Sequence, residues 1–143
     1  MRIGKFSLNP ETSPGGEQYR EKLRPWVEGV KGQGIGEWIE LSTDSYETPV
    51  SFFLISNGYV SFEKPYLYKK NSRIKKMRIT CKEENIDFVV GLKDTPDFQE
   101  IRLPKKITGL KPTFRFTIEE VYPGTKWEDT CLNLIIPLGD LPH

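Results

Sequence analysis

Histidine is almost absent from this chain, since the only one among 143 residues is the last, His143. Chain ends are usually frayed, so this position suits no working side chain. The scarcity argues against Ser–His and Cys–His nucleophile pairs and against metal sites built on histidine. The glycine-rich residues 32–36 are followed by a strand-like pattern, whereas a dinucleotide fingerprint requires a helix there. We therefore expect a protein that is not an enzyme and that needs no cofactor.

Cysteine is scarce as well, because Cys81 and Cys131 are the only two. They are too few for a disulfide scaffold, and their separation matches no zinc motif. Both lie in apolar, strand-like runs. Two buried free thiols are the expected state.

The chain also lacks a dominant charge and any long apolar run. It has 21 Lys and Arg against 20 Asp and Glu, a formal net charge of +1, so no global field favours nucleic acid or an anionic membrane. The apolar run at 132–138 is too short to span a bilayer, and residues 1–8 lack the apolar core of a secretory signal. If the domain works outside the cell, we expect its export signal upstream of this sequence.

What the sequence does contain is alternation with a period of two. In Met77–Lys82 and in Phe114–Glu119, apolar side chains alternate with charged or hydroxyl side chains, as half-buried strands require. Further strands are expected over 37–41, 50–55, 86–92, 98–103 and 132–136, with a short one at Phe6 and Leu8 and one helical turn over 18–23. Seven or eight strands joined by Gly- and Pro-rich turns predict a single all-β domain over residues 1–143, an antiparallel β-sandwich or barrel.

Two aromatic features are candidates for ligand contact. Trp26 and Glu28 precede the glycine-rich loop, and they form either an aromatic platform beside a carboxylate or a tryptophan packed over one end of the sandwich. Tyr59 lies in the irregular stretch 57–70, which also contains Phe62, Tyr66 and Tyr68. These rings either pin the loop to the sandwich or form a stacking surface of the kind that sugars use.

Arg73 is the strongest single candidate. Its guanidinium has five donors in a rigid fork that suits sugar hydroxyls or the carboxylate of an acidic sugar. The alternative is an internal ion pair with Asp94 or Asp129 that ties the loops together. Asn57 begins an Asn–Gly turn and Lys126 ends a Pro–Gly turn, so both are turn residues first and binding residues second.

The function hypotheses differ in what these residues contact. If the loops meet at one end, the ligand-binding set is Trp26, Glu28, Asn57, Tyr59, Arg73, Asp94, Lys126 and Asp129. The first hypothesis is a non-catalytic module that binds a glycan or glycoconjugate. The alternative is a protein-interaction or assembly module that uses the loops or an edge strand of the same sandwich. A hydrolase built on two carboxylates is the minority hypothesis.

Several segments, in order, resemble one family. They are Trp26–Gly29 with Gly32, Gly34 and Gly36–Glu37; Asn57–Tyr59; Asn71–Arg73 with Lys75–Lys76; Leu92–Thr95; Val121–Lys126; and Asp129–Cys131. Together they resemble the NADase-type glycan-binding domain, a bacterial relative of discoidin domains among the galactose-binding-like jelly rolls. The resemblance extends over about residues 19–136. It implies a jelly-roll sandwich, a carbohydrate-binding role without catalysis, and a place in a bacterial cell envelope or secreted protein.

The chain departs from the family pattern in two places. The segment Tyr19–Trp26 is too short for the Asn–x–x–Asp–Gly loop that relatives carry there, and Leu134 stands where relatives tend to have a glutamate. In discoidin-like folds these two features commonly serve a structural calcium. A calcium ion needs about six to eight oxygen ligands, so we expect no calcium or other metal at this place.

Overall fold

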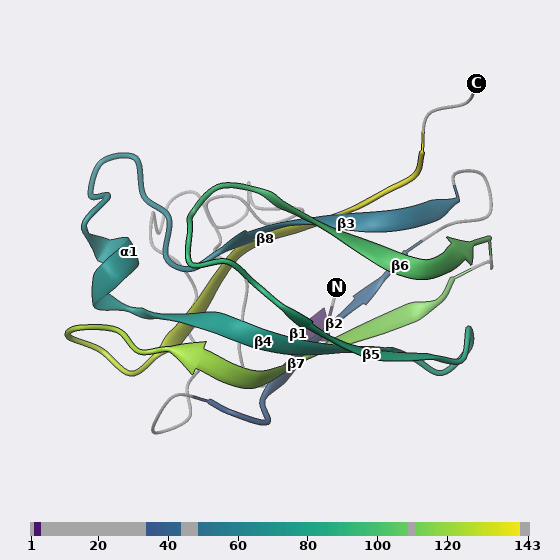
Figure 1. Ribbon diagram of the computed structural model, residues 1–143, viewed down its shortest axis with the longest axis horizontal. Helices are drawn as coiled ribbons and strands as arrows, with labels where there is room; N and C mark the ends of the chain where they lie inside the picture. Colours follow the sequence, from purple (N-terminus) through teal and green to yellow (C-terminus); the bar gives the residue numbers. More distant parts are fainter. Residues whose placement is uncertain (1, 4–33, 44–48, 109–110, 141–143) are drawn as a thin grey trace.

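The strands and the short helix of the protein were located in a computed structural model that describes residues 2–3, 34–43, 49–108 and 111–140 (Figure 1). The elements, in chain order, are β1 (Arg2–Ile3), β2 (Trp38–Ser42), β3 (Val50–Asn57), α1 (Leu67–Lys70), β4 (Ser72–Cys81), β5 (Ile86–Gly91), β6 (Gln99–Ile107), β7 (Thr113–Tyr122) and β8 (Thr130–Leu138). No helix within these ranges is long and apolar enough to cross a membrane.

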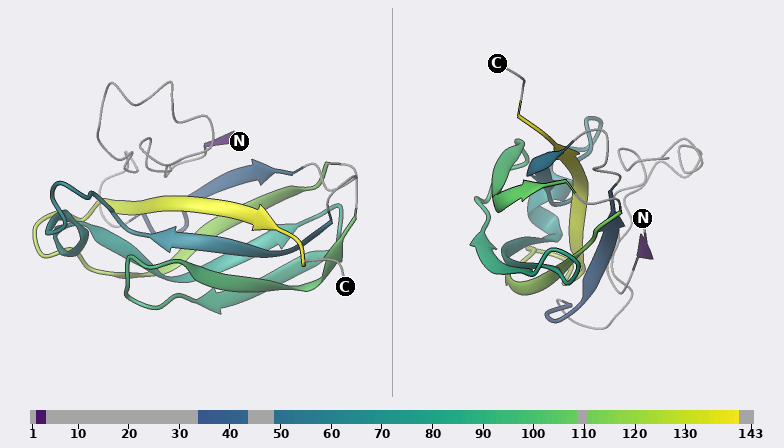
Figure 2. Two further views of the ribbon diagram at one scale, coloured as in Figure 1. Left: turned by 90° about the horizontal axis from the view of Figure 1, so that it is seen from above. Right: turned by 90° about the vertical axis from the view of Figure 1, so that its right-hand side faces the viewer.

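The strands form two layers that face each other around a common interior (Figure 2). One layer has the order β1-β2-β7-β4-β5, and the other has the order β8-β3-β6. All pairs within the layers are antiparallel. The layers join where β4 and β8 run parallel for two residue pairs, Ser72 with Thr130 and Arg73 with Cys131. The all-β sandwich expected from the sequence is confirmed.

The alternation in the sequence explains why these segments are strands. In β7, Phe114, Phe116 and Ile118 are fully buried, while Arg115 between them is exposed on the outer face. In β2, Ile39 and Leu41 point inward in the same way. Each strand expected within the described residues is present, although β4 begins five residues earlier than the pattern at Met77 suggested. The strand expected at Phe6 and Leu8 and the helical turn over 18–23 lie outside the described residues.

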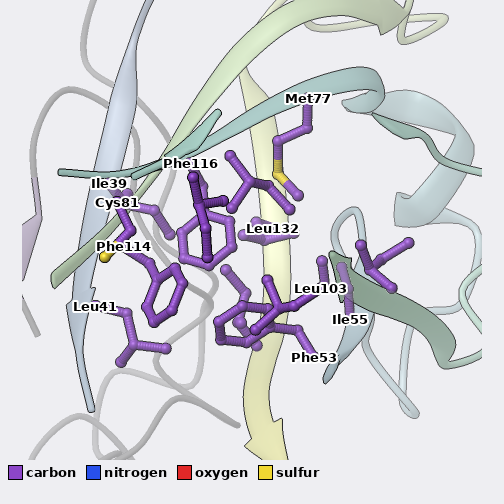
Figure 3. Packing of buried hydrophobic residues seen from close by; sticks show 14 of the residues in the cluster. Ile39, Leu41, Phe53, Ile55, Met77, Cys81, Leu103, Phe114, Phe116 and Leu132 are labelled. Atoms are coloured by element: carbon purple, nitrogen blue, oxygen red, sulfur yellow. The ribbon is translucent and has the colours of Figure 1, made fainter. Parts of the chain in front are cut away.

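The core is centred on three phenylalanine rings from both layers (Figure 3). Phe53 of β3 meets Phe114 and Phe116 of β7 edge to face, with ring centroids 5.0 and 5.2 Å apart. Such contacts align the positive ring edge with the negative face and add to the burial of apolar area. Cys81 and Cys131 are both buried and form no disulfide, as the sequence predicted.

Three connections gather at one end of the sandwich, on the left of Figure 1, which we call the α1 end. They are the segment 58–71 that contains α1, the β5–β6 loop and the β7–β8 loop. Hydrogen bonds join the first and the third of them: the amides of Thr125 and Lys126 donate to the carbonyls of Lys69 and Lys70, at 3.0 and 3.1 Å. The β5–β6 loop is joined through Asp94, which accepts from the Tyr68 hydroxyl at 2.8 Å. The loops therefore form one surface.

Phe53→Ala tests the core. We expect it to lower the free energy of unfolding by about 3–5 kcal/mol, because it removes a buried ring and leaves a cavity between the layers. Phe98→Ala is the matched control, because this ring is 53% exposed, and we expect a change of at most about 0.5 kcal/mol. Urea unfolding monitored by circular dichroism measures both. Equal losses for the two variants would contradict the packing described here.

Candidate functional site

Arg73, the second residue of β4, lies at the centre of the α1 end. Its side chain is only 5% exposed. It binds both carboxylate oxygens of Asp94 in the β5–β6 loop, with Nε–Oδ1 at 3.1 Å and Nη2–Oδ2 at 2.9 Å. Nη1 donates to the backbone carbonyls of Lys69, Asn71 and Pro123. One guanidinium thus connects all three loops, and the ion pair with Asp94 that the sequence offered as an alternative is present.

The surroundings of Asp94 keep it ionised. Burial disfavours its charged form, but hydrogen bonds from Arg73, Tyr68 and Lys69 outweigh that effect and lower the pKa of Asp94 to about 2. The Tyr68 hydroxyl donates to Oδ1 at 2.8 Å, and burial together with the Asp94 charge raises the pKa of Tyr68. Asp94 is therefore an acceptor and counter-ion at neutral pH rather than a general acid.

The side chain of Asn57 also forms its hydrogen bonds inside the fold. It is fully buried at the end of β3. Its amide nitrogen donates to the carbonyl of Ile74 at 2.6 Å, and its amide oxygen accepts from the Ile74 amide at 3.1 Å. Gly58 follows with φ +87°, and a side chain there would lie 2.5 Å from the Tyr68 ring. The Asn–Gly pair therefore joins β3 to β4 and lets Tyr68 pack closely.

The remaining predicted residues lie at the same end. Tyr59 follows the Asn–Gly pair. Lys126 is exposed, and its ammonium lies 4.7 Å from the centre of the Trp127 ring. Asp129 is half-buried, and its backbone carbonyl accepts a hydrogen bond from the Ser72 amide at 2.9 Å. The structure thus brings Asn57, Tyr59, Arg73, Asp94, Lys126 and Asp129 to one end of the sandwich. Trp26 and Glu28 lie outside the described residues.

A mainly apolar groove opens at this end beside the ion pair. Its volume is about 480 Å³, and its lining residues are Ser56, Tyr59, Val60, Ser61, Phe62, Pro65, Tyr68, Pro96, Asp97, Phe98, Asn133 and Leu134. They come from the end of β3, the segment before α1, α1 itself, the β5–β6 loop and β8. Phe62 is 92% exposed and Phe98 53% exposed. An apolar recess with protruding rings is typical of a binding surface rather than of a covered core.

The aromatic stretch 57–70 contains rings with opposite roles. Tyr68 is buried and pins α1 through its hydrogen bond to Asp94, whereas Phe62 points to solvent. Tyr68 thus pins the loop to the sandwich, whereas Phe62 is exposed; the stacking surface for a ligand stays a prediction. Pro65, Pro96 and Phe98 were not predicted as site residues, because their place in the groove depends on loops that meet only in the folded chain.

The expectation that no calcium is bound rests on two places in the sequence. Leu134 lines the apolar groove from β8. The segment Tyr19–Trp26 lies outside the described residues. The absence of calcium thus stays a prediction.

Asp94→Asn tests the ion pair. It leaves the buried Arg73 guanidinium without its counter-charge, and we expect a loss of about 2–4 kcal/mol of unfolding free energy at pH 7. Because the folded pKa of Asp94 lies below its ordinary 3.8, the wild type loses this stabilisation as the pH falls through the window from about 4 to about 2.

Urea unfolding at pH 7 and thermal unfolding between pH 2 and pH 4 measure both effects. The variant should show a shallower pH dependence than the wild type in that window. Lys69→Gln is the control, because Lys69 also binds Asp94 but is mostly exposed, and its loss should stay below about 1 kcal/mol. Unchanged stability of Asp94→Asn would contradict the role given to the pair.

Comparison with known proteins identifies the family. The model of the NAD glycohydrolase translocation F5/8 type C domain matches residues 19–136. Among solved structures, the NMR structure of the Streptococcus pyogenes NAD+-glycohydrolase translocation domain is similar, with a TM-score of 0.50 and 24% sequence identity over 80% of this chain and 96% of that one. At this identity the structural likeness supports the fold. No curated protein matches the chain.

These matches confirm the resemblance found in the sequence at the level of the discoidin-like family and its jelly-roll sandwich. Their descriptions name translocation and do not mention a carbohydrate. The family model matches most of the chain, from the segment before Trp26 to Ile136, near the end of β8. The chain belongs to the NAD glycohydrolase translocation F5/8 type C domain family.

Proposed function

We propose that this chain is a non-catalytic protein-interaction module that helps to deliver the bacterial secreted protein of which it is a part. The observation that carries the proposal is the apolar groove at the α1 end with the exposed ring of Phe62 at its rim. Exposed aromatic side chains beside a recess are the usual anchors of protein–protein interfaces. A translocation role, which the family's description names, requires recognition of other macromolecules and no chemistry in this domain.

The burial of two polar side chains that were predicted to contact a ligand supports the same conclusion. The strongest hydrogen-bonding side chains predicted to contact a ligand, Arg73 and Asn57, are buried and bound to Asp94 and to the backbone of Ile74. A sugar is recognised chiefly through hydrogen bonds from such groups to its hydroxyls. With these donors satisfied internally, the groove offers mainly apolar contact.

A glycan is the second candidate ligand. The rings of Tyr59 and Phe62 lie in the groove lining together with the hydroxyl of Ser61 and the carboxylate of Asp97. An aromatic face beside hydroxyl and carboxylate groups also suits the C–H face and hydroxyls of a sugar. The experiment below therefore includes both ligand classes.

Phe62→Ser tests the groove as a protein-binding site. A library of random 12-residue peptides displayed on phage is selected on the immobilised wild-type domain, and an array of glycans is screened in parallel. We expect selected peptides to bind the variant about 30-fold more weakly, because loss of an aromatic anchor costs about 2 kcal/mol. The melting temperature should not change, because the ring is 92% exposed.

Val89→Ser is the matched control, because Val89 is 50% exposed on β5 and does not line the groove. It should bind the selected peptides as the wild type does. Selective binding on the glycan array, together with peptides that ignore Phe62→Ser, would overturn the proposal in favour of the carbohydrate ligand.

A further inference from the structure

We infer that the groove accepts an acidic polypeptide segment that carries an aromatic or aliphatic anchor, an inference that rests on the proposed protein-interaction function. The inference comes from lysine side chains at the same end of the sandwich as the groove. Lys69 and Lys70 end α1, and Lys126 lies in the β7–β8 loop. The apolar groove alone specifies an anchor, while the lysines specify the charge of the chain that carries it.

The positions of these lysines are fixed by the backbone. The amides of Lys126 and Trp127 both donate to the Lys70 carbonyl, at 3.1 and 2.9 Å. Gly124 permits this close approach, because a side chain there would collide with the carbonyls of Lys70 and Trp127. Lys70 and Lys126 are therefore held next to each other although they are far apart in sequence.

Aromatic rings hold the lysine side chains in place. The ammonium of Lys70 lies 4.9 Å from the centre of the Tyr66 ring, that of Lys126 lies 4.7 Å from the Trp127 ring, and that of Lys69 lies 5.6 Å from the Tyr68 ring. A cation–π contact at an exposed site is weak, but it orients the side chain and leaves ammonium hydrogens available to an acceptor. The charges of Lys70 and Lys126 are thus pre-positioned for a partner, whereas the ammonium of Lys69 is paired with Asp94.

Within the described part of the chain, Lys70 and Lys126 form no ion pair. The nearby carboxylate of Asp94 is already bound by Arg73. The whole chain has a net charge of only +1. The lysine pair is therefore a local feature of this end and does not reflect an excess of positive charge over the whole protein. Acidic side chains of a partner are its complement.

One contact links α1 to the groove: Tyr68 lines the groove, and the ammonium of Lys69 lies 5.6 Å from the centre of its ring. Pro65 and Tyr68 line the groove, and Lys69 and Lys70 follow directly along α1. A bound segment can therefore place an apolar side chain beside Phe62 and a carboxylate on the α1 side. The recess of about 480 Å³ favours a polypeptide over a flat lipid surface, which leaves such a recess unfilled.

The test begins with the peptides selected on the wild-type domain. We expect them to be enriched in Asp and Glu next to an aromatic or branched aliphatic residue, relative to the unselected library. A synthetic peptide of the best sequence is then compared with the same peptide carrying Asn and Gln in place of Asp and Glu. We expect the neutral peptide to bind about tenfold more weakly, and the affinity of the acidic peptide to fall as salt is raised.

The paired variant Lys70→Gln/Lys126→Gln should weaken binding of the acidic peptide about five- to tenfold and leave the neutral peptide unaffected. The control is Lys82→Gln/Lys106→Gln, which removes the same charge from exposed lysines at the ends of β4 and β6 that lie opposite the α1 end. It should bind both peptides as the wild type does. Melting temperatures of all variants show that each one is folded.

The failures of this inference and of the proposed function are distinguishable. Peptides that need Phe62 but show no acidic preference would overturn the inference and leave the proposed function standing. Selection of no peptide at all would overturn both. Vesicles of phosphatidylcholine with phosphatidylserine provide the last arm: sedimentation that Lys70→Gln/Lys126→Gln abolishes, without binding of the acidic peptide, would assign the lysines to an anionic membrane and overturn the inference.

Discussion

The charge pair between Arg73 and Asp94 is the interaction on which the α1 end depends. A guanidinium that is almost fully buried is tolerated only when its charge and its donors are satisfied. Arg73 meets this requirement with the two oxygens of Asp94 and with carbonyls from α1, the strand entrance and the β7–β8 loop. Because these partners come from separate loops, satisfying one side chain fixes all of them relative to β4.

The location of this pair explains why it affects several neighbouring elements. Arg73 lies where β4 and β8 run parallel and join the two layers of the sandwich. The buried amide of Asn57 bridges the end of β3 to the neighbouring residue Ile74. Tyr68 then packs against Gly58 and hydrogen-bonds to Asp94. Gly58 and Tyr68 are thus both held, and the segment between them carries the exposed ring of Phe62.

Most of the fold could be predicted from the sequence, because a strand covered on one face leaves an alternating pattern. Phe114, Phe116 and Ile118 show that pattern plainly. The helix α1 left no such signal. It has four residues and no side-chain cap, and its Lys69 and Lys70 carbonyls accept hydrogen bonds from the distant β7–β8 loop. A helix of that length is stabilised by tertiary contacts rather than by its own sequence.

The sequence predicted where the candidate site lies, but it did not predict which of its polar side chains face a ligand. Loops of a sandwich gather at its ends, and the described residues among the predicted set are indeed together. Whether a polar side chain beside a turn faces a ligand or the interior cannot be read from its neighbours in sequence. For Arg73 the answer depends on Asp94, which lies 21 residues away along the chain and comes within reach only when β4 and β5 pair.

This distinction bears on what the surface can recognise. The Arg73 guanidinium and the Asn57 amide, which would have suited sugar hydroxyls, are bound inside the fold. The groove is therefore lined mainly by apolar side chains, with Ser61 and Asp97 among them, and Lys70 and Lys126 lie at the same end of the sandwich. Apolar area provides binding energy without strong directional demands, whereas pre-positioned charges provide selectivity and faster association. A surface of this composition suits a flexible polypeptide segment with one anchor and a few carboxylates. The same buried pair that removes Arg73 from ligand contact ties the segments that carry Lys70 and Lys126 to β4, through the carbonyls of Lys69, Asn71 and Pro123.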